Sequence, residues 1–399
     1  MIKFPIYLDN HSTTKVDPRV LEAMLPYFTD FYGNASSKSH EFGWKAEAAV
    51  EFARKQCSRL VNCEPRDIIF TSGATESVNL ALKGAAEAYA SKGNHIITSI
   101  IEHEAVLDTC KNLEGRGFSV TYLPVDEFGL VSPAELEKAI TPETILVSIM
   151  WVNNEIGTIQ PIGELSEICR EKKVLFHTDA TQAVGKLPID LAKMNIDLMS
   201  FSSHKIYGPK GTGALYKKGK IPRVRITPQL DGGAQEKGLR AGTLNVPGIV
   251  GFGKACEIAM TDMAADQARI KGLRDRLYSG LTAGIENIKL NGHPEKRING
   301  NLNISIKNID ADSLMISIKD IAVSTGSACS SESVEPSHVL TAIGIDNKLK
   351  RSTIRFGIGK FNTAEEIDYA VAKITEKVKY LFSILPDVKR NRKGDHASV

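Results

Sequence analysis

The stretch DIIFTSGATESVNLALKGAAEAYASKGNHIITSI, residues 67–100, decides the fold that we predict for this chain. It begins with a run rich in β-branched and aromatic residues at 67–71 and continues with helical apolar spacing at 75–89. A second β-rich run follows at 95–100. A strand, a helix and a second strand at this spacing predict a βαβ unit, in which the two strands are parallel.

The same alternation continues to about residue 217. Further strands are predicted at 120–125, 144–152, 174–179 and 198–202, and helices at 104–113, 133–140 and 163–172. The repetition predicts an α/β fold whose largely parallel sheet is covered by helices on both faces. Ligands bind such sheets at the carboxyl ends of the strands, so the residues that follow each strand are the candidates for a site.

Beyond about residue 253 the pattern changes to that of a smaller α+β domain. The predicted helices are 265–283, 311–318, 336–343 and 364–383, and the predicted strands are 288–290, 301–306, 321–324 and 353–358. The basic residues of the segment after 384 lie among polar neighbours, which favours a solvated tail over a binding arm.

Length, charge and cysteine usage limit the functions that the chain can have. A length of 399 residues predicts two or three domains. The net charge of +3 gives no overall field for nucleic acid. The longest apolar run, 145–152, is far shorter than a membrane span, and the first residues lack the apolar core of a signal peptide. None of the six cysteines forms a C-x-x-C pair, so neither zinc nor a redox dithiol is indicated, and a cytoplasmic location is expected.

Three strand ends carry weak signals when each is taken alone. Small residues and Thr75 after the first strand, at 72–76, can bind a phosphate through free N–H groups at a helix start. His103, after the second strand, fits a surface histidine or, with its two flanking glutamates and a third partner, a metal ligand. Asn154 lies in a turn-forming Asn-Asn pair after the fourth strand.

Two later strand ends carry stronger signals. Asp179 ends an apolar strand and is followed by Gln182, while His177 on the same face leaves a metal pair open. Lys205 ends the next strand beside hydroxyls, His204 and a glycine-rich segment, where its pKa can fall and its amine can act as a nucleophile. Neither the S-x-x-K spacing nor the glycines at 208–213 complete a β-lactamase or dinucleotide motif. A buried acid, a nucleophilic lysine and a phosphate cradle are together what pyridoxal phosphate requires.

The chain resembles the cysteine desulfurases of the NifS/IscS type, within the aspartate-aminotransferase fold group of pyridoxal phosphate enzymes. The stretches that carry the resemblance run in order from about residue 6 to 361: YGNASS (32–37), TSGATESVNLALKG (71–84), VNNEIG (152–157), HTDATQAVGK (177–186), SSHKIYGPKGTGALY (202–216), LRAGTLNVPGIVG (239–251), STGSACSS (324–331), EPSHVL (335–340) and IRFGIG (354–359). The resemblance implies a large domain at 15–255 with a mainly parallel seven-stranded sheet, a small domain formed by 1–14 and 256–385, and a flexible tail at 386–399.

The resemblance also assigns roles to single residues. Lys205 corresponds to the Schiff-base lysine, Asp179 to the partner of the pyridine nitrogen, and Gln182 to the partner of the ring hydroxyl. His103 would stack on the ring and shuttle a proton, and Asn154 would lie against cofactor and substrate. The phosphate would be held by Ala74, Thr75, Ser202, His204 and, from the neighbouring subunit of a homodimer, Thr243.

The implied reaction converts L-cysteine to L-alanine. Arg355 would bind the substrate carboxylate, and Cys329, in a loop of the small domain, would accept the sulfur as a persulfide. The sulfur would pass to an iron–sulfur scaffold, with which some members share the loop cysteine as a cluster ligand, or to tRNA thiolation. A selenocysteine lyase, another pyridoxal phosphate lyase and a non-enzymatic sulfur-trafficking scaffold stay open as alternatives.

The chain departs from the family pattern at two places. The N-terminal stretch reads DNHSTT at 9–14, where the family usually has alanine beside the threonine pair and no histidine. We expect His11 to alter the entrance of the site and not its core. The segment after Leu385 does not resemble the tail by which housekeeping members dock an iron–sulfur scaffold, so the identity of the acceptor stays open.

Overall fold

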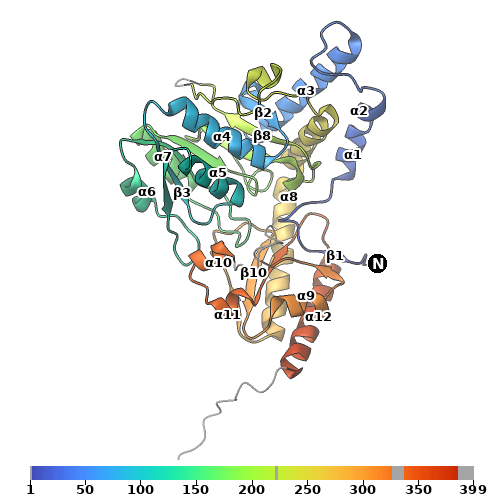
Figure 1. Ribbon diagram of the computed structural model, residues 1–399. Coiled ribbons are helices and arrows are strands. Elements are labelled where there is room, and N and C mark those ends of the chain that lie inside the picture. Colours follow the sequence, from blue (N-terminus) through green and yellow to red (C-terminus); the bar gives the residue numbers. More distant parts are fainter. Residues whose placement is uncertain (1, 221–222, 326–336, 385–399) are drawn as a thin grey trace, which may run out of the picture.

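The computed structural model describes residues 2–220, 223–325 and 337–384. Its largest sheet has seven strands in the order β2-β8-β7-β6-β5-β3-β4 (Figure 1). Their bounds are Ile68–Thr71 (β2), His95–Ser99 (β3), Ser119–Leu123 (β4), Thr144–Ser148 (β5), Leu175–Asp179 (β6), Leu198–Ser202 (β7) and Gly213–Lys217 (β8). Of these seven strands, β8 runs in the opposite direction to the other six, which confirms the predicted mainly parallel sheet.

Helices cover both faces of this sheet because neighbouring strand residues point to opposite sides. In β2, Ile68 and Phe70 pack into one core with α3 and the first half of α8, whereas Ile69 packs into another with α4 and α5. The helices around the sheet are Pro18–Met24 (α1), Pro26–Thr29 (α2), Glu41–Leu60 (α3), Ala74–Tyr89 (α4), Glu104–Glu114 (α5), Pro133–Ala139 (α6) and Ile162–Lys172 (α7).

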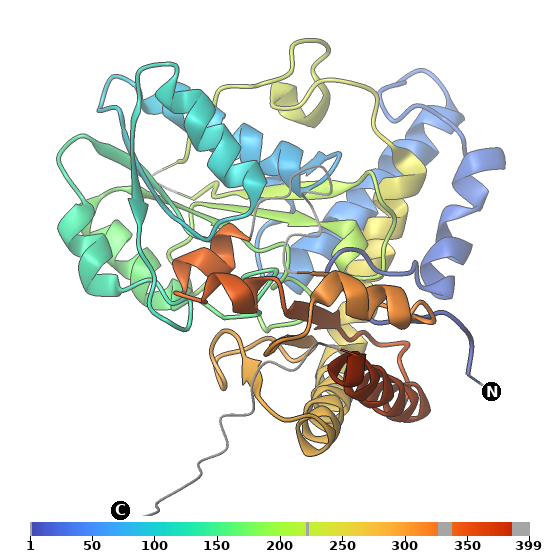
Figure 2. The same cartoon turned by 60° about the horizontal axis from the view of Figure 1, so that its bottom comes forward.

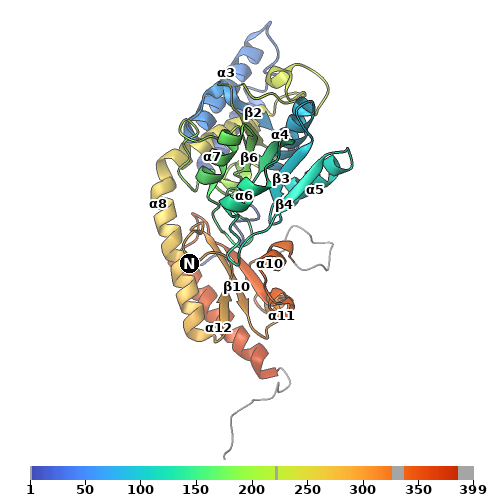
Figure 3. The same cartoon turned by 90° about the vertical axis from the view of Figure 1, so that its left-hand side faces the viewer.

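Helix α8 (Val246–Gly284) is far longer than the predicted helix at 265–283. The prediction missed its first half, where glycines at 248, 251 and 253 lower the helix propensity. Tertiary packing explains two of these glycines, because a Cβ at Gly253 would lie 2.6 Å from the Cα of Ala53 on α3 and one at Gly251 would lie 2.5 Å from the sulfur of Met24 on α1. Figures 1 and 3 show α8 running from the large sheet to β10 (Asn301–Ile306) and α12 (Ala364–Ile384) in the C-terminal part of the chain.

The remaining elements form a second layer around the C-terminal half of α8. Strands Ile288–Leu290 (β9), Asn301–Ile306 (β10) and Thr353–Gly357 (β12) make an antiparallel sheet, and Ile6–Tyr7 (β1) pairs in parallel with Ile321–Ala322 (β11). The helices here are Ala311–Ser317 (α9), His338–Ala342 (α10), Asn347–Lys350 (α11) and Ala364–Ile384 (α12). Figure 2 shows α12 beside α8 in this layer.

Two apolar cores divide α8 between them. Its residues up to Ile258 pack with the large sheet, and those from Ile270 onward pack with β10, β12 and α12, as do Ile6 and Leu8. We propose on this basis that the chain has the two domains expected from the sequence, with the boundary at about residue 255 inside α8. The expected tail at 386–399 lies outside the described residues.

Candidate active site

A cavity of about 420 Å³ lies at the carboxyl ends of β2, β6 and β7 and is closed on one side by β12. Its size is in the range of small-molecule and cofactor sites. Ten of the twelve residues singled out from the sequence line it: Ala74, Thr75, His103, Asn154, Asp179, Gln182, Ser202, His204, Lys205 and Arg355. Thr243 is exposed and does not line this cavity, and Cys329 lies outside the described residues.

One end of the cavity is built to receive an anion. Helix α4 begins there after Gly73, and no side chain of the described residues caps its N-terminus, so its first N–H groups carry the positive end of the helix dipole. Strand β8 packs directly against the residue that precedes α4. A Cβ at Gly213 of β8 would lie only 2.6 Å from the backbone of Gly73. Arg240 binds Glu76 in the first turn of α4 at 2.8 Å, and its charge offsets that of a carboxylate that would repel an anion.

Lys205 follows β7 in a short 3₁₀ turn, Ser203–Lys205. Its amine donates hydrogen bonds to the carbonyls of His11, at 2.5 Å, and Ser12, at 2.7 Å. The neighbouring His204 contacts the Thr13 hydroxyl at 3.0 Å. Burial, and then the charge of Lys205, lower the pKa of His204 to about 4, so its ring is neutral at neutral pH. The N-terminal segment therefore fixes both residues from one side.

Asp179 is the last residue of β6, and Gln182 lies in the loop that follows it. Asp179 is buried, and its Oδ1 accepts from the Thr181 N–H at 2.9 Å. The Gln182 amide nitrogen donates to the carbonyl of His11 at 2.9 Å, and its oxygen accepts from the amine of Lys186 at 2.7 Å. Nδ1 of His11 lies 3.1 Å from the same oxygen. The expectation that His11 alters only the entrance is therefore wrong, since its ring is buried and bound to a residue of the site.

His103 is the N-cap of α5, and its Nδ1 accepts from the N–H of Ala105 at 3.1 Å. In the neutral ring the proton is therefore on Nε2. The metal interpretation of this segment fails, because the Glu102 carboxylate is buried and accepts from Ser99 and Met150 instead. The described residues contain no group of three or more side chains that could hold a metal ion.

Arg355 brings a buried cation from β12 to the same cavity. One terminal nitrogen donates to Asp9 Oδ1 at 2.9 Å and to the Ser12 hydroxyl at 2.7 Å, and the other donates to the carbonyl of Asn154 at 3.1 Å. Within the described ranges, its Nε has no hydrogen-bond partner. A planar guanidinium held in this way is suited to bind a carboxylate.

Sequence reasoning missed Glu155, which directly follows Asn154. Its carboxylate is buried and accepts from the Ser337 hydroxyl at 2.6 Å. Burial raises the pKa of Glu155 to about 7, although the bond from Ser337 opposes the shift. Ser324 forms a backbone bridge with Arg355. Both described ends of the segment that carries Cys329 are thus attached beside the cavity.

The second conceivable metal pair also has another explanation. Both ring nitrogens of His177 contact serine hydroxyls inside the sheet, Ser148 at 2.8 Å and Ser200 at 2.9 Å. Burial lowers its pKa to about 3. His177 is therefore a neutral core residue.

The five described cysteines are free thiols, and all except the partly exposed Cys63 are buried, as structural residues are.

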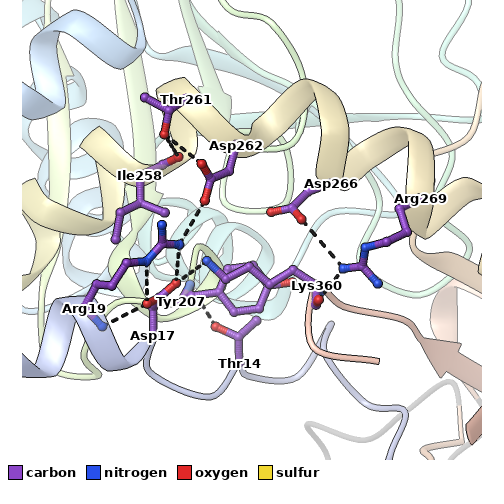
Figure 4. Close-up of polar contacts among 10 residues, drawn as sticks. All are labelled: Thr14, Asp17, Arg19, Tyr207, Ile258, Thr261, Asp262, Asp266, Arg269 and Lys360. Carbon is purple, nitrogen blue, oxygen red and sulfur yellow. Dashed lines mark hydrogen bonds and ion pairs between the residues drawn. The ribbon is translucent and has the colours of Figure 1, made fainter. Parts of the chain in front are cut away.

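A network of ion pairs joins the start of α1, α8 and the loop after β12 (Figure 4). Asp17 accepts from Arg19, at 2.9 Å, and from Lys360, and Arg19 also binds Asp262 on α8 at 2.9 Å. The backbone N–H of Lys360 donates to the Tyr207 hydroxyl at 2.7 Å. Burial raises the pKa of Asp17, but the hydrogen bonds from both cations outweigh it and hold that pKa below its ordinary value. The turn that carries Lys205 is thereby tied to α8 and to the loop after β12.

Stability is expected to depend on pH through Glu102. Burial, opposed by the hydrogen bonds from Met150 and Ser99, raises its pKa from 4.5 to about 8. Because the folded pKa lies above the unfolded one, the contribution to stability is complete below pH 4.5 and is lost as the pH rises towards 8. Glu102→Gln keeps an acceptor without the charge. Relative to the wild type, its free energy of unfolding should rise by about 2 to 4 kcal/mol between pH 5 and pH 8.

Urea denaturation at several pH values measures this difference. Glu127→Gln, at an exposed position, is the matched control and should show no such trend. A difference for Glu102→Gln that stays constant over the whole pH range would contradict the prediction.

Comparisons with known proteins place the chain in a family. Residues 6–370 match the aminotransferase class-V family. A cysteine desulfurase IscS of Anaeromyxobacter dehalogenans (strain 2CP-C) is 53% identical over 385 residues, which are 96% of this chain and 95% of that protein. A solved structure described as a NifS-like protein has a TM-score of 0.88 at 41% identity, over 94% of this chain and 99% of that one.

Another solved structure, SspA in complex with cysteine, has a TM-score of 0.80 at 38% identity and covers 90% of this chain and 100% of that one. No described helix has the length and apolar character needed to cross a membrane. Family match, near-complete alignment and fold agree, and the chain belongs to the class-V aminotransferases and, among them, to the cysteine desulfurases.

Proposed function

We propose that this protein is a pyridoxal phosphate-dependent cysteine desulfurase that converts L-cysteine to L-alanine and transfers the sulfur to its own Cys329. The observation that carries the proposal is the single cavity in which Lys205, Asp179 and the uncapped N-terminus of α4 meet. An amine, a buried acid and an anion site are the three groups that pyridoxal phosphate needs, and its family is dependent on this cofactor.

The residues present fit the cofactor. Ala74 and Thr75 at the start of α4, with Ser202 and His204, would hold the phosphate, and Lys205 would bind the aldehyde carbon covalently. Asp179 would keep the pyridine nitrogen protonated, and Gln182 would donate to the ring hydroxyl. The bound cofactor supplies an electron sink for the pair left when the Cα proton of the substrate is removed.

The remaining residues would act on the substrate. Arg355 would bind its carboxylate beside Asn154, and His103 would stack on the cofactor ring and move a proton through Nε2. The Cys329 thiolate would attack the substrate sulfur, so that the Cβ–S bond breaks, an S–S bond forms and alanine leaves after protonation. The described neighbours of the Cys329 segment support this step, since Ser324 bridges to Arg355 and Ser337 binds Glu155.

Thr243 supports a homodimer with shared sites as part of the proposal. It lies in an exposed loop and does not line the cavity of its own subunit. The same loop is firmly held at Glu236, whose carboxylate accepts from the Arg54 guanidinium at 2.7 Å twice and from the Phe70 N–H at 2.8 Å. A loop held this rigidly can present Thr243 to the phosphate of a second subunit.

The proposal includes a cytoplasmic location, which the free thiols of the described cysteines support, and a protein acceptor for the persulfide. By chemistry the acceptor provides a thiol, as an iron–sulfur scaffold or a tRNA thiolation enzyme does. No direct contact with nucleic acid or membrane is part of the proposal.

The test is a product analysis of the purified protein reconstituted with pyridoxal phosphate. With L-cysteine and a thiol reductant, alanine and sulfide should form in equal amounts. L-Selenocysteine in a parallel reaction measures substrate preference. A strong preference for selenocysteine would favour a selenocysteine lyase. Failure to bind the cofactor would revive the scaffold alternative.

A further inference from the structure

The imidazole of His11 is a buried group to which the proposed reaction gives no task. It lies in the segment after β1, is only 4% exposed, and lines the cavity beside Lys205 and Gln182. Its backbone carbonyl accepts hydrogen bonds from the amine of Lys205 and from the side-chain amide of Gln182. His11 therefore contacts the site through its main chain and through its ring.

The hydrogen bonds around Gln182 determine which nitrogen of His11 carries the proton. The Lys186 amine donates to the atom of Gln182 that lies 2.7 Å away, so that atom is the amide oxygen. The amide nitrogen then faces the carbonyl of His11, which is an acceptor. Nδ1 of His11, 3.1 Å from the same amide oxygen, is consequently an N–H donor.

The surroundings of His11 keep its ring neutral. Its Nε2 is buried and has no partner among the residues that the structure describes, so a second proton would create a buried donor without an acceptor. Burial, and then the charges of Lys186 and Arg355, also hold the pKa of His11 well below its ordinary range. His11 is thus a neutral ring with a fixed Nδ1–H.

We propose that His11 is a positioning residue that fixes the Gln182 amide so that its second N–H points to the phenolic oxygen of pyridoxal phosphate. The proposal rests on the proposed function and deepens it. A flipped amide would place its nitrogen against the Lys186 amine and the His11 Nδ1–H, and its oxygen against the His11 carbonyl. All three contacts would then pair like with like.

The expected effect can be read from the colour of the bound cofactor. A hydrogen bond donated to the phenolic oxygen stabilises the anionic form of that oxygen. It therefore lowers the pH at which the bound cofactor loses its proton. Without the donor, the pH midpoint of the visible absorption band should rise by about one unit. The other charged or titratable groups that face the cavity, with Lys186 behind it, are unchanged in each variant: Glu76, His103, Asp179, His204, Lys205, Lys210 and Arg355.

Two variants of His11 make the test. His11→Phe keeps a ring and removes both nitrogens, and its midpoint should rise. In His11→Asn the amide nitrogen can take the place of Nδ1, so the midpoint should return towards the wild-type value. His293→Leu is the matched control, because the partly buried His293 also uses Nδ1 in hydrogen bonds but does not line the cavity. Its midpoint should not change.

Gln182→Leu distinguishes a failure of the role proposed for His11 from a failure of the role assigned to Gln182. If Gln182→Leu raises the midpoint and His11→Phe does not, His11 has no positioning role and the proposed function stands. If neither variant changes it, the assignment of Gln182 to the ring hydroxyl is wrong as well. If His11→Phe does not fold, His11→Ala replaces it, and an unchanged midpoint in that variant overturns the proposal in the same way.

Discussion

Lys205→Ala is expected to lack the visible absorption band of bound pyridoxal phosphate and to lose desulfurase activity by more than about 10³-fold, the scale on which loss of a catalytic nucleophile acts. The amine lies in the cavity with Asp179 and the N-terminus of α4, where it can form a covalent bond with the cofactor aldehyde. Its direction is fixed by hydrogen bonds to the carbonyls of His11 and Ser12. Alanine offers neither the covalent bond nor a group that returns a proton to the substrate.

Absorbance spectra and the rate of alanine release measure this effect. Lys193→Ala is the matched control, because the Lys193 side chain is 83% exposed and forms an ion pair with Asp190. That variant should keep both the band and the rate. A Lys205→Ala protein that still shows the band and still releases alanine would exclude Lys205 as the lysine that binds the cofactor.

The part of the fold that alternates strand and helix could be predicted from the sequence because its signals are local. Each strand from β2 to β7 is a short apolar run, and the cap formed by Ser132 and Pro133 marks the start of α6. Strand β8 and helix α3 were not predicted. The first half of α8 was missed because its glycines serve contacts with α1 and α3, which are more than 190 residues away in sequence.

In the site too, features with a local sequence signal could be predicted, and features that depend on distant contacts could not. Strand ends converge in a parallel sheet, so Asp179 and Lys205 could be selected from their positions in sequence alone. The roles of His11 and Glu155 depend on partners far along the chain, Gln182 and Ser337. The sequence carries one signal for His11, namely that the family usually has no histidine in this stretch. That departure alone predicts a change at the entrance of the site. Only the packed structure shows that the departure lies beside Gln182.

Cys329→Ser is expected to keep the visible band and to release no sulfide from L-cysteine in the presence of a reductant. The two halves of the result have different causes. The band depends on Lys205, which the substitution does not touch. Sulfur transfer depends on a thiolate, and a serine hydroxyl at neutral pH is neither ionised nor able to form the S–S bond.

The described neighbours of Cys329 set the distance over which it can act. Ser324 bridges to Arg355 at the cavity, and five residues of extended chain span at most about 17 Å. We therefore expect the thiol to come within reach of a substrate whose carboxylate Arg355 binds. After incubation with L-cysteine alone, the wild-type protein should gain one sulfur atom at Cys329 by mass spectrometry.

Cys63→Ser is the matched control for this prediction. Cys63 is the partly exposed member of the five described cysteines, it does not line the cavity, and burial, followed by the charge of Asp67, raises the pKa of its thiol. Its substitution should leave sulfide release and the mass gain intact. Full sulfide release by Cys329→Ser would show that another thiol receives the sulfur, because this substitution leaves the cofactor chemistry at Lys205 unchanged. A sulfur atom that appears on Cys63 in the wild type would show the same.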